Sequence, residues 1–249
     1  MEKRASIEKA AELIRQHNRI VFFGGAGVST ESGIPDFRSV DGLYNMKYDY
    51  PPEIILSHRF FFEHTAEFFR FYRDKILITA KPNKAHSFLA FLEDQKKIAG
   101  IITQNIDGLH SDAGSKNVYE LHGSIRRNHC IKCGEVYGST KMYEEPFPVC
   151  RCGGIIKPDV VLYEEPLDNL TVRGAVQAIV NSDLMIIGGT SLAVYPAAGL
   201  IDYYRGRDII LINKSKTPAD YMASVVINEA IGKVFGEIER IVYPIQNNE

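Results

Sequence analysis

The sequence lacks the features that typify nucleic-acid-binding, membrane and secreted proteins. Its 29 basic residues are balanced by 31 acidic ones, and the net charge of −2 provides no overall basic field for nucleic acid. No run of about 18 uncharged apolar residues could span a bilayer. Residues 1–20 have the spacing of an amphipathic helix and no cleavage site of a secretory signal. We therefore expect a cytoplasmic protein without a membrane or nucleic-acid partner.

Cysteine is scarce and occurs in one cluster. The chain has four cysteines, in a C-x-x-C pair, a spacer of sixteen residues and a C-x-C pair. In a reducing compartment this clustering predicts a metal site and not disulfides. Four thiolates suit a closed tetrahedral Zn²⁺ site without an open position for catalysis, although the C-x-C pair requires a tighter turn than usual. The predicted zinc ligands are Cys130, Cys133, Cys150 and Cys152.

Apolar residues make up 45% of the 249 residues, enough for a sizeable core. Short apolar runs alternate with segments of helical spacing, which predicts an α/β fold with a doubly wound parallel, Rossmann-like sheet. The expected strands are 20–23, 98–103, 184–187, 209–212 and 224–227. The expected helices include 82–96, 168–180, 196–205 and 229–240.

Two segments interrupt this alternation. Residues 40–81 are rich in aromatic side chains, and 57–77 have the spacing of one or two helices, which predicts a helical insertion. The cysteines lie in a second, zinc-ribbon-like insertion at 118–161. The predicted Rossmann-like domain therefore comprises residues 1–39, 82–117 and 162–249.

A glycine-rich turn follows the first expected strand. Gly25 and Gly27 allow a sharp turn and a close approach to a ligand, and Ser29 and Thr30 can open a helix whose N–H groups face an anion. The third glycine of the usual dinucleotide fingerprint is absent. These glycines alone are equally compatible with a turn that binds nothing.

Further polar residues lie just beyond strand ends. Gly33 and Pro35 break any helix after the glycine turn, so Asp36, Phe37 and Arg38 are expected in a loop beside it. The second strand ends in residues 104–107, Gln-Asn-Ile-Asp. In an open α/β sheet such positions lie where ligands bind.

One histidine is a candidate general base. His122, in Glu-Leu-His-Gly, lies between the 104–107 loop and the cysteines, and imidazole titrates near neutrality. A single histidine is more often a structural residue. His110 is the rival candidate.

Several motifs, taken in order, resemble those of the sirtuins, the NAD-dependent protein deacylases. The resemblance spans residues 20–240. It begins with Gly25-Ala26-Gly27-Val28-Ser29 and Ser32-Gly33-Ile34-Pro35-Asp36-Phe37-Arg38. It continues with Thr103-Gln104-Asn105-Ile106-Asp107, Glu120-Leu121-His122-Gly123, the four cysteines, Lys157-Pro158-Asp159-Val160-Val161, Gly189-Thr190-Ser191-Leu192 and Val194-Tyr195-Pro196-Ala197. The departures are Gly24, where threonine is common, and Asp159, where asparagine is frequent.

The resemblance implies a deacetylase that consumes NAD and acts on acetyl-lysine proteins or peptides, with His122, Asn105 and Asp107 as its catalytic residues. It implies an NAD site made of Gly25, Ala26, Gly27, Ser29, Thr30, Ile34, Asp36, Phe37, Arg38, Gln104, Ile106, Gly189, Thr190, Ser191, Asn213 and Ile231. It implies peptide contacts from Val160, Leu162, Tyr163 and Val194.

The resemblance also bears on the acyl group. In sirtuins that remove succinyl or malonyl groups, a tyrosine and an arginine bind the acyl carboxylate, and the matching positions here are Phe69 and Tyr72. Neither is a cation, and Arg70 and Arg73 face other directions on a helix. We therefore expect a preference for neutral acyl chains such as acetyl.

Three other functions fit parts of the sequence. The same NAD site could support mono-ADP-ribosyl transfer to protein. A zinc-ribbon binding module with a degenerate nucleotide fold would leave His122, Asn105 and Asp107 without a role. A hydride-transferring dehydrogenase lacks support, because no acidic residue occupies the usual place after a second strand.

Overall fold

The computed structural model describes residues 2–36 and 50–244. Its largest element is a six-stranded sheet of order β3-β2-β1-β7-β8-β9, in which each neighbouring pair is parallel. The strands are β1 (Ile20–Gly24), β2 (Ile98–Thr103), β3 (Val118–Glu120), β7 (Leu184–Gly188), β8 (Asp208–Ile212) and β9 (Val225–Ile227). The chain builds outward from β1 to β3 and then from β7 to β9, so the strand order reverses between β1 and β7. The predicted parallel sheet is confirmed.

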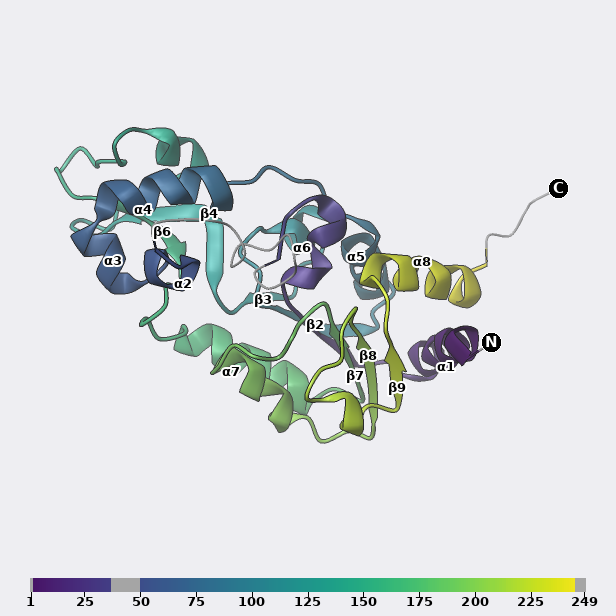
Figure 1. Cartoon of the computed structure of the whole chain (residues 1–249). Coiled ribbons are helices and arrows are strands. Elements are labelled where there is room, and N and C mark those ends of the chain that lie inside the picture. Colours follow the sequence, from purple (N-terminus) through teal and green to yellow (C-terminus); the bar gives the residue numbers. More distant parts are fainter. Residues whose placement is uncertain (1, 37–49, 245–249) are drawn as a thin grey trace.

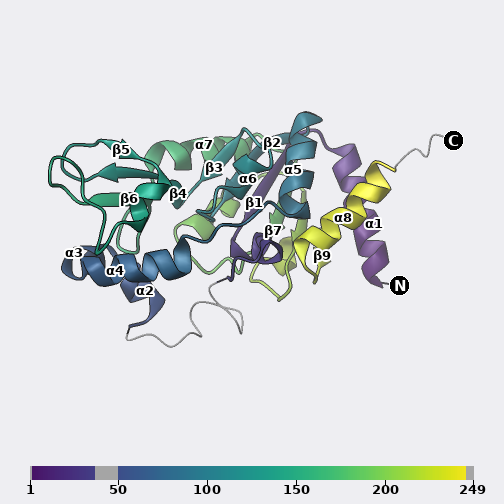
Figure 2. The same ribbon diagram turned by 90° about the horizontal axis from the view of Figure 1, so that it is seen from above.

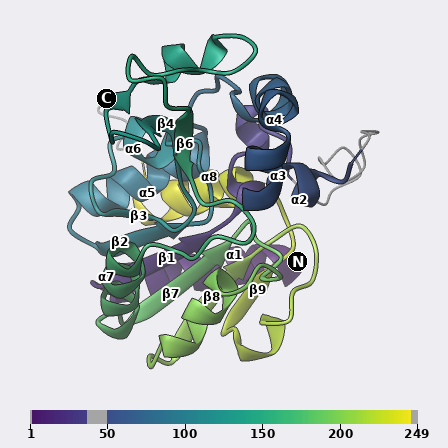
Figure 3. The ribbon, with the colours of Figure 1, turned by 90° about the vertical axis from the view of Figure 1, so that its left-hand side faces the viewer.

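Helices cover both faces of this sheet (Figure 3). One face carries α1 (Glu2–Gln16), α5 (Lys84–Asp94) and α8 (Ile231–Val242), and the other carries α7 (Asn169–Val180) and η6 (Ala197–Tyr203). Alternate side chains of β1 explain why two layers form, since Phe22 packs with the first group and Phe23 with the second. None of the helices in the described part of the chain is long and apolar enough to cross a membrane.

A smaller module lies at one end of the molecule (Figures 1 and 2). Its antiparallel sheet has the order β5-β4-β6, and helical segments of the 50–76 region pack beside it. The strands are β4 (Gly123–Cys130), β5 (Val136–Tyr137) and β6 (Ile156–Val160). The helical segments are α2 (Pro52–Ile55), α3 (His58–Glu63), α4 (Thr65–Phe71), η4 (Tyr72–Ile76) and, from the cysteine region, η5 (Ser139–Tyr143). The two insertions therefore share one apolar core.

Two predicted helices take a tighter form. After β1 the chain makes two 3₁₀ turns, η1 (Ala26–Val28) and η2 (Thr30–Ser32), where we expected a helix opening at Ser29 and Thr30. The amide of Asn83 donates to Val28 O at 2.7 Å, so this carbonyl bonds to a side chain instead of continuing a helix. Segment η6 is also 3₁₀, and Gly199 within it is a poor helix former.

We propose a division into two domains in which one boundary differs from the boundary predicted from the sequence. Strand β3 pairs with β2 and so extends the large sheet, although the predicted boundary of the zinc insertion falls at residue 118. We propose that the small module begins at residue 121. Two short helices complete the large domain, α6 (Leu109–Asp112) and η7 (Asp220–Met222).

Candidate active site

A cavity of about 500 Å³ lies at the carboxyl ends of the central strands, where the strand order reverses. It is bounded by both domains, and its volume lies in the usual range of small-molecule and cofactor sites. Every predicted site residue within the described ranges lines it, namely Gly25, Ala26, Gly27, Ser29, Thr30, Ile34, Asp36, Gln104, Asn105, Ile106, Asp107, His122, Val160, Leu162, Tyr163, Gly189, Thr190, Ser191, Val194, Asn213 and Ile231. Phe37 and Arg38 lie outside the described residues.

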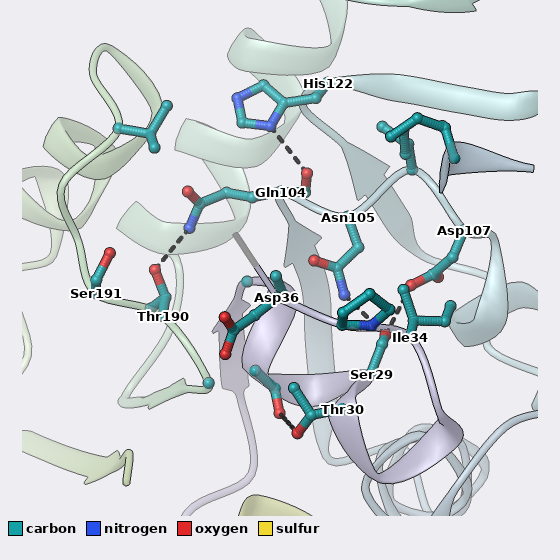
Figure 4. Close-up of a pocket in the computed structure, with 18 of the residues that line it drawn as sticks. Ser29, Thr30, Ile34, Asp36, Gln104, Asn105, Asp107, His122, Thr190 and Ser191 are labelled. Carbon is teal, nitrogen blue, oxygen red and sulfur yellow. Dashed lines mark hydrogen bonds between the residues drawn. The ribbon is translucent and has the colours of Figure 1, made fainter. Parts of the chain in front are cut away.

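The glycine turn packs directly on the loop after β7. Gly27 N donates to Gly189 O at 2.8 Å, and a Cβ atom at Gly27 would lie 2.8 Å from Gly189 Cα. A side chain at either position would therefore push the two loops apart. The hydroxyl of Thr30 donates to Gly27 O at 3.1 Å (Figure 4). These contacts fix the two loops that flank the switch point of the sheet.

Ser29 links two polar residues of the following loop. Its hydroxyl donates to Asp107 Oδ2 at 2.6 Å and accepts from Asn105 Nδ2 at 3.0 Å (Figure 4). Asp107 Oδ1 accepts from Leu109 N at 2.9 Å. Asn105 and Ser29 are buried, so the bonds are shielded from water. The network holds a carboxylate and an amide in fixed directions at the cavity wall, a suitable arrangement for binding a carboxamide.

His122 is oriented by one hydrogen bond. Its Nδ1 lies 2.8 Å from Gln104 O, and since a carbonyl oxygen only accepts, Nδ1 carries the proton and Nε2 the lone pair. The side chain of Gln104 donates to Thr190 Oγ1 at 3.0 Å, which braces the same loop (Figure 4). Burial lowers the pKa of His122, and the hydrogen bond to Gln104 offsets only part of this effect. The imidazole is therefore neutral at pH 7 and can accept a proton.

The rival histidine lies elsewhere. His110 is only 2% exposed and packs against His86, with ring centroids 4.7 Å apart. Burial lowers the pKa of His110 to about 3 and that of His86 to about 4. His110 is not among the cavity-lining residues, so the geometry favours His122 as the candidate base.

The segment after β6 forms the opposite wall. Val161 N donates to His122 O at 2.9 Å, which ties this wall to the histidine. Glu165 anchors the segment, since its carboxylate accepts from Leu162 N at 2.9 Å and Lys157 Nζ at 3.0 Å. Asp159, one of the departures from the family pattern, is paired with Arg127 at 3.2 Å.

Sequence reasoning missed part of the lining. The apolar positions carry no chemical signature, and only the fold brings them to the cavity. The missed residues are Pro35, Leu56, Tyr72, Lys75, Ile76, Ile78, Ile125, Val161, Glu164, Glu165, Leu167, Tyr195, Pro196, Ile212, Lys214, Ser215, Glu229 and Ala230. For Tyr72 the sequence indicates only that it occupies a position where some family members carry an acyl-binding arginine.

The four cysteines meet outside this cavity. Their sulfur atoms all lie within 4.8 Å of one another, with Cys130 Sγ 3.5 Å from Cys152 Sγ and Cys133 Sγ 3.6 Å from Cys150 Sγ. Tetrahedral zinc with bonds of about 2.3 Å needs sulfur–sulfur separations of about 3.8 Å. The thiols thus fit a structural Zn²⁺, as the spacing predicts.

The strand order, the glycine turn and the polar loops at the switch point define an α/β protein of the dinucleotide-binding class. The described four-cysteine cluster adds a zinc site to this framework.

The Sir2 family model matches residues 25–196, and the chain belongs to the Sir2 family. An NAD-dependent protein deacetylase of Clostridium perfringens (strain 13 / Type A) is 58% identical over 238 residues, covering 93% of this chain and 98% of the relative. A structure described as the "Structural Basis for the Mechanism and Regulation of Sir2 Enzymes" is 39% identical, with a TM-score of 0.87 and coverage of 96% and 98%. A Sir2 structure with an inhibitor, 2'-O-acetyl-ADP-ribose and a deacetylated p53 peptide is 34% identical, with a TM-score of 0.83 and coverage of 94% and 98%.

Proposed function

We propose that this protein is an NAD-dependent protein-lysine deacetylase, which moves the acetyl group from lysine to ADP-ribose and releases nicotinamide. The observation that carries the proposal is the shared cavity. It combines a neutral, oriented His122, the Asn105–Ser29–Asp107 network and an apolar wall that ends at Leu162. The family and its deacetylase relatives support the same activity.

The cavity suits NAD along its length. Gly25, Ala26, Gly27, Thr30 and Gln104 would hold the pyrophosphate and ribose, Ile34, Asn105, Ile106 and Asp107 the nicotinamide, and Gly189, Thr190, Ser191, Asn213 and Ile231 the adenosine. Ser29 would contribute by holding Asp107 and Asn105 in place, and Asp36 would contact NAD from the loop beside the glycine turn. Phe37 and Arg38 stay predictions. When bound, NAD supplies an electrophilic ribose carbon whose leaving group is nicotinamide.

His122 acts as the general base. With Nδ1 fixed to Gln104 O, the Nε2 lone pair can take a proton from a ribose hydroxyl. Asn105 and Asp107 orient the reacting groups, because the bonds through Ser29 leave their side chains little freedom. The rest of the catalytic effect comes from positioning and from the exclusion of water by the surrounding apolar side chains.

The acyl-lysine peptide would lie along Val160, Leu162, Tyr163 and Val194. The structural zinc would stabilise the small module that carries this wall and would take no part in the chemistry. The cytoplasmic location and the absence of nucleic-acid and membrane partners stay predictions from the sequence.

Mass spectrometry of an acetyl-lysine peptide tests the function. We expect deacetylation only with NAD, with release of nicotinamide and acetyl-ADP-ribose. His122→Ala should lower kcat by about 10²- to 10⁴-fold, the usual range for loss of a general base. Deacetylation without NAD, or at an undiminished rate in the variant, would reject the mechanism.

The alternative is mono-ADP-ribosyl transfer from the same site. It would leave label from adenine-labelled NAD on the acceptor protein, whereas deacetylation leaves that label in a small molecule. Stoichiometric labelling of protein without loss of acetyl groups would favour the alternative.

A further inference from the structure

Tyr72 is a polar residue in a mostly apolar part of the cavity wall. It begins η4, a π-helical segment, and its side chain is 0% exposed. Its ring stacks on Phe68 with centroids 5.7 Å apart. It belongs to the same apolar cluster as Val160 and Leu162 and lines the cavity with them. The ring therefore lies on the side of the cavity where Val160 and Leu162 are proposed to contact the acyl-lysine peptide.

The hydroxyl of Tyr72 is buried and has no hydrogen-bond partner within the described ranges. A buried hydroxyl without a partner destabilises a folded protein, and phenylalanine would make the same ring contacts without this effect. Burial also raises the pKa of Tyr72 far above its usual value, so the phenol stays protonated and can donate. An acceptor on a bound ligand would satisfy it.

We propose that the Tyr72 hydroxyl donates a hydrogen bond to an oxygen carried on the acyl chain, so that the enzyme prefers neutral, oxygen-bearing acyl-lysines such as 3-hydroxybutyryl-lysine. The inference rests on the proposed deacylase function and specifies its substrate class. Acetyl-lysine remains a substrate, but its methyl group leaves the hydroxyl without a partner.

The nearby cations do not suit an acidic acyl group. Lys75 also lines the cavity, but its ammonium group is paired with Asp74 at 3.0 Å. The guanidinium of Arg73 donates to Glu144 O at 3.0 Å and Pro146 O at 3.3 Å, in the cysteine region. A succinyl carboxylate would lose water without gaining a dedicated cation. The neutral acyl preference expected from Phe69 and Tyr72 therefore fits this wall.

The test compares peptides that differ only in the acyl group: acetyl, butyryl, 3-hydroxybutyryl and succinyl. For the wild type we expect kcat/KM for 3-hydroxybutyryl to exceed that for butyryl by about 10-fold, the effect of one well-formed hydrogen bond. Tyr72→Phe keeps the ring contacts and removes only the donor, so it should lower this ratio to about 1. The matched control Tyr221→Phe removes a hydroxyl from a side chain that is 87% exposed and should leave the ratio unchanged.

Several results would overturn the inference. One is a 3-hydroxybutyryl-to-butyryl ratio that is equal in wild type and Tyr72→Phe, and another is succinyl as the best substrate. A lower melting temperature of ligand-free Tyr72→Phe would reveal a stabilising bond of the hydroxyl within the protein, which also contradicts it. If acetyl and butyryl peptides are turned over, these failures leave the deacylase function intact. If no peptide is turned over, the proposed function fails and the inference with it.

Discussion

At the scale of single residues, His122 shows how one backbone contact prepares a side chain for its role. The bond to Gln104 O selects the tautomer, and burial keeps the ring neutral. We therefore expect the midpoint of the acid limb of the kcat/KM profile for deacetylation to lie below pH 6.5, the ordinary pKa of histidine. Activity should be full at pH 7 and decline as the ring is protonated. Rates measured between pH 5 and 8 test this, and a midpoint above 6.5 would contradict it.

Ser29 is predicted to matter for both stability and activity. Ser29→Ala removes the donor to Asp107 and the acceptor for Asn105, and leaves the buried Asn105 amide without that partner. The free energy of unfolding should fall by about 1–3 kcal/mol. Urea unfolding measures this loss, and kcat should fall as well because the two side chains proposed to orient the reacting groups lose their own orientation. The control Ser87→Ala changes an exposed serine of α5 and should have little effect on either quantity.

The histidine pair should make the fold sensitive to acid. The pKa values of His86 and His110 are lowered in the folded protein to about 4 and about 3. In the unfolded chain both pKa values are near 6.5. Between pH 6.5 and these folded-state values the unfolded chain therefore binds more protons than the folded protein, and the free energy of unfolding falls as the pH falls through this window. His110→Leu removes one of these groups, so its loss of stability between pH 6.5 and 4.5 should be smaller than that of the wild type by about 2 kcal/mol. Equal losses in urea titrations at the two pH values would show that the pair is not responsible.

At the scale of elements, the start of α5 connects helix formation to the cofactor loops. Asn83 caps α5 by accepting from Ala85 N at 2.8 Å, and it also donates to Val28 O and to Ser32 Oγ. Asn83→Ala should cost about 1 kcal/mol of stability and raise the KM for NAD, with the peptide KM unchanged. The matched control is Asp168→Ala, which removes the cap of α7 on the far face and should affect stability alone. A shift in the NAD KM of both variants would mean that it reflects general destabilisation.

The sequence predicts elements best where apolar runs are continuous. β1, β2, β7 and β8 are buried strands, and their composition alone identifies them. β3 has only three residues and no distinct apolar run, so its place at the sheet edge comes from pairing with β2. The 3₁₀ turns after β1 depend on the amide of Asn83, about 55 residues further on, and no local pattern contains that information.

At the scale of the whole molecule, loss of the zinc should destabilise the small module and leave the large domain folded. Cys130 and Cys150 belong to the same apolar cluster as the cavity-lining residues Leu56, Ile76, Ile125, Val160 and Leu162, which we call the acyl wall. Loss of the metal should therefore loosen this wall. Zinc removal by a chelator should abolish peptide turnover. Hydrogen exchange should show faster exchange in β4 and β6 and unchanged protection in β7 and β8. A metal-free protein that stays fully folded and active would contradict this role of the thiols.

The sequence predicts those residues of the candidate site that belong to recognisable motifs. The glycine turn, the 104–107 loop and His122 follow strand ends or family motifs, and the described members meet in one cavity. The acyl wall was not predictable in this way. Ile125, Ile76 and Leu56 are ordinary apolar residues, and only the packing of the two insertions against each other brings them to the cavity.

The bond from Val161 N to His122 O joins the proposed general base to the start of the acyl wall. These two parts should move as one rigid body when the domains rotate, and any such rotation would alter their position only relative to the cofactor loops. Residues 50–76 and 121–165, whose packing forms this wall, are therefore natural cassettes for protein engineering. Exchanged together between family members, they should transfer acyl selectivity and leave cofactor affinity with the recipient.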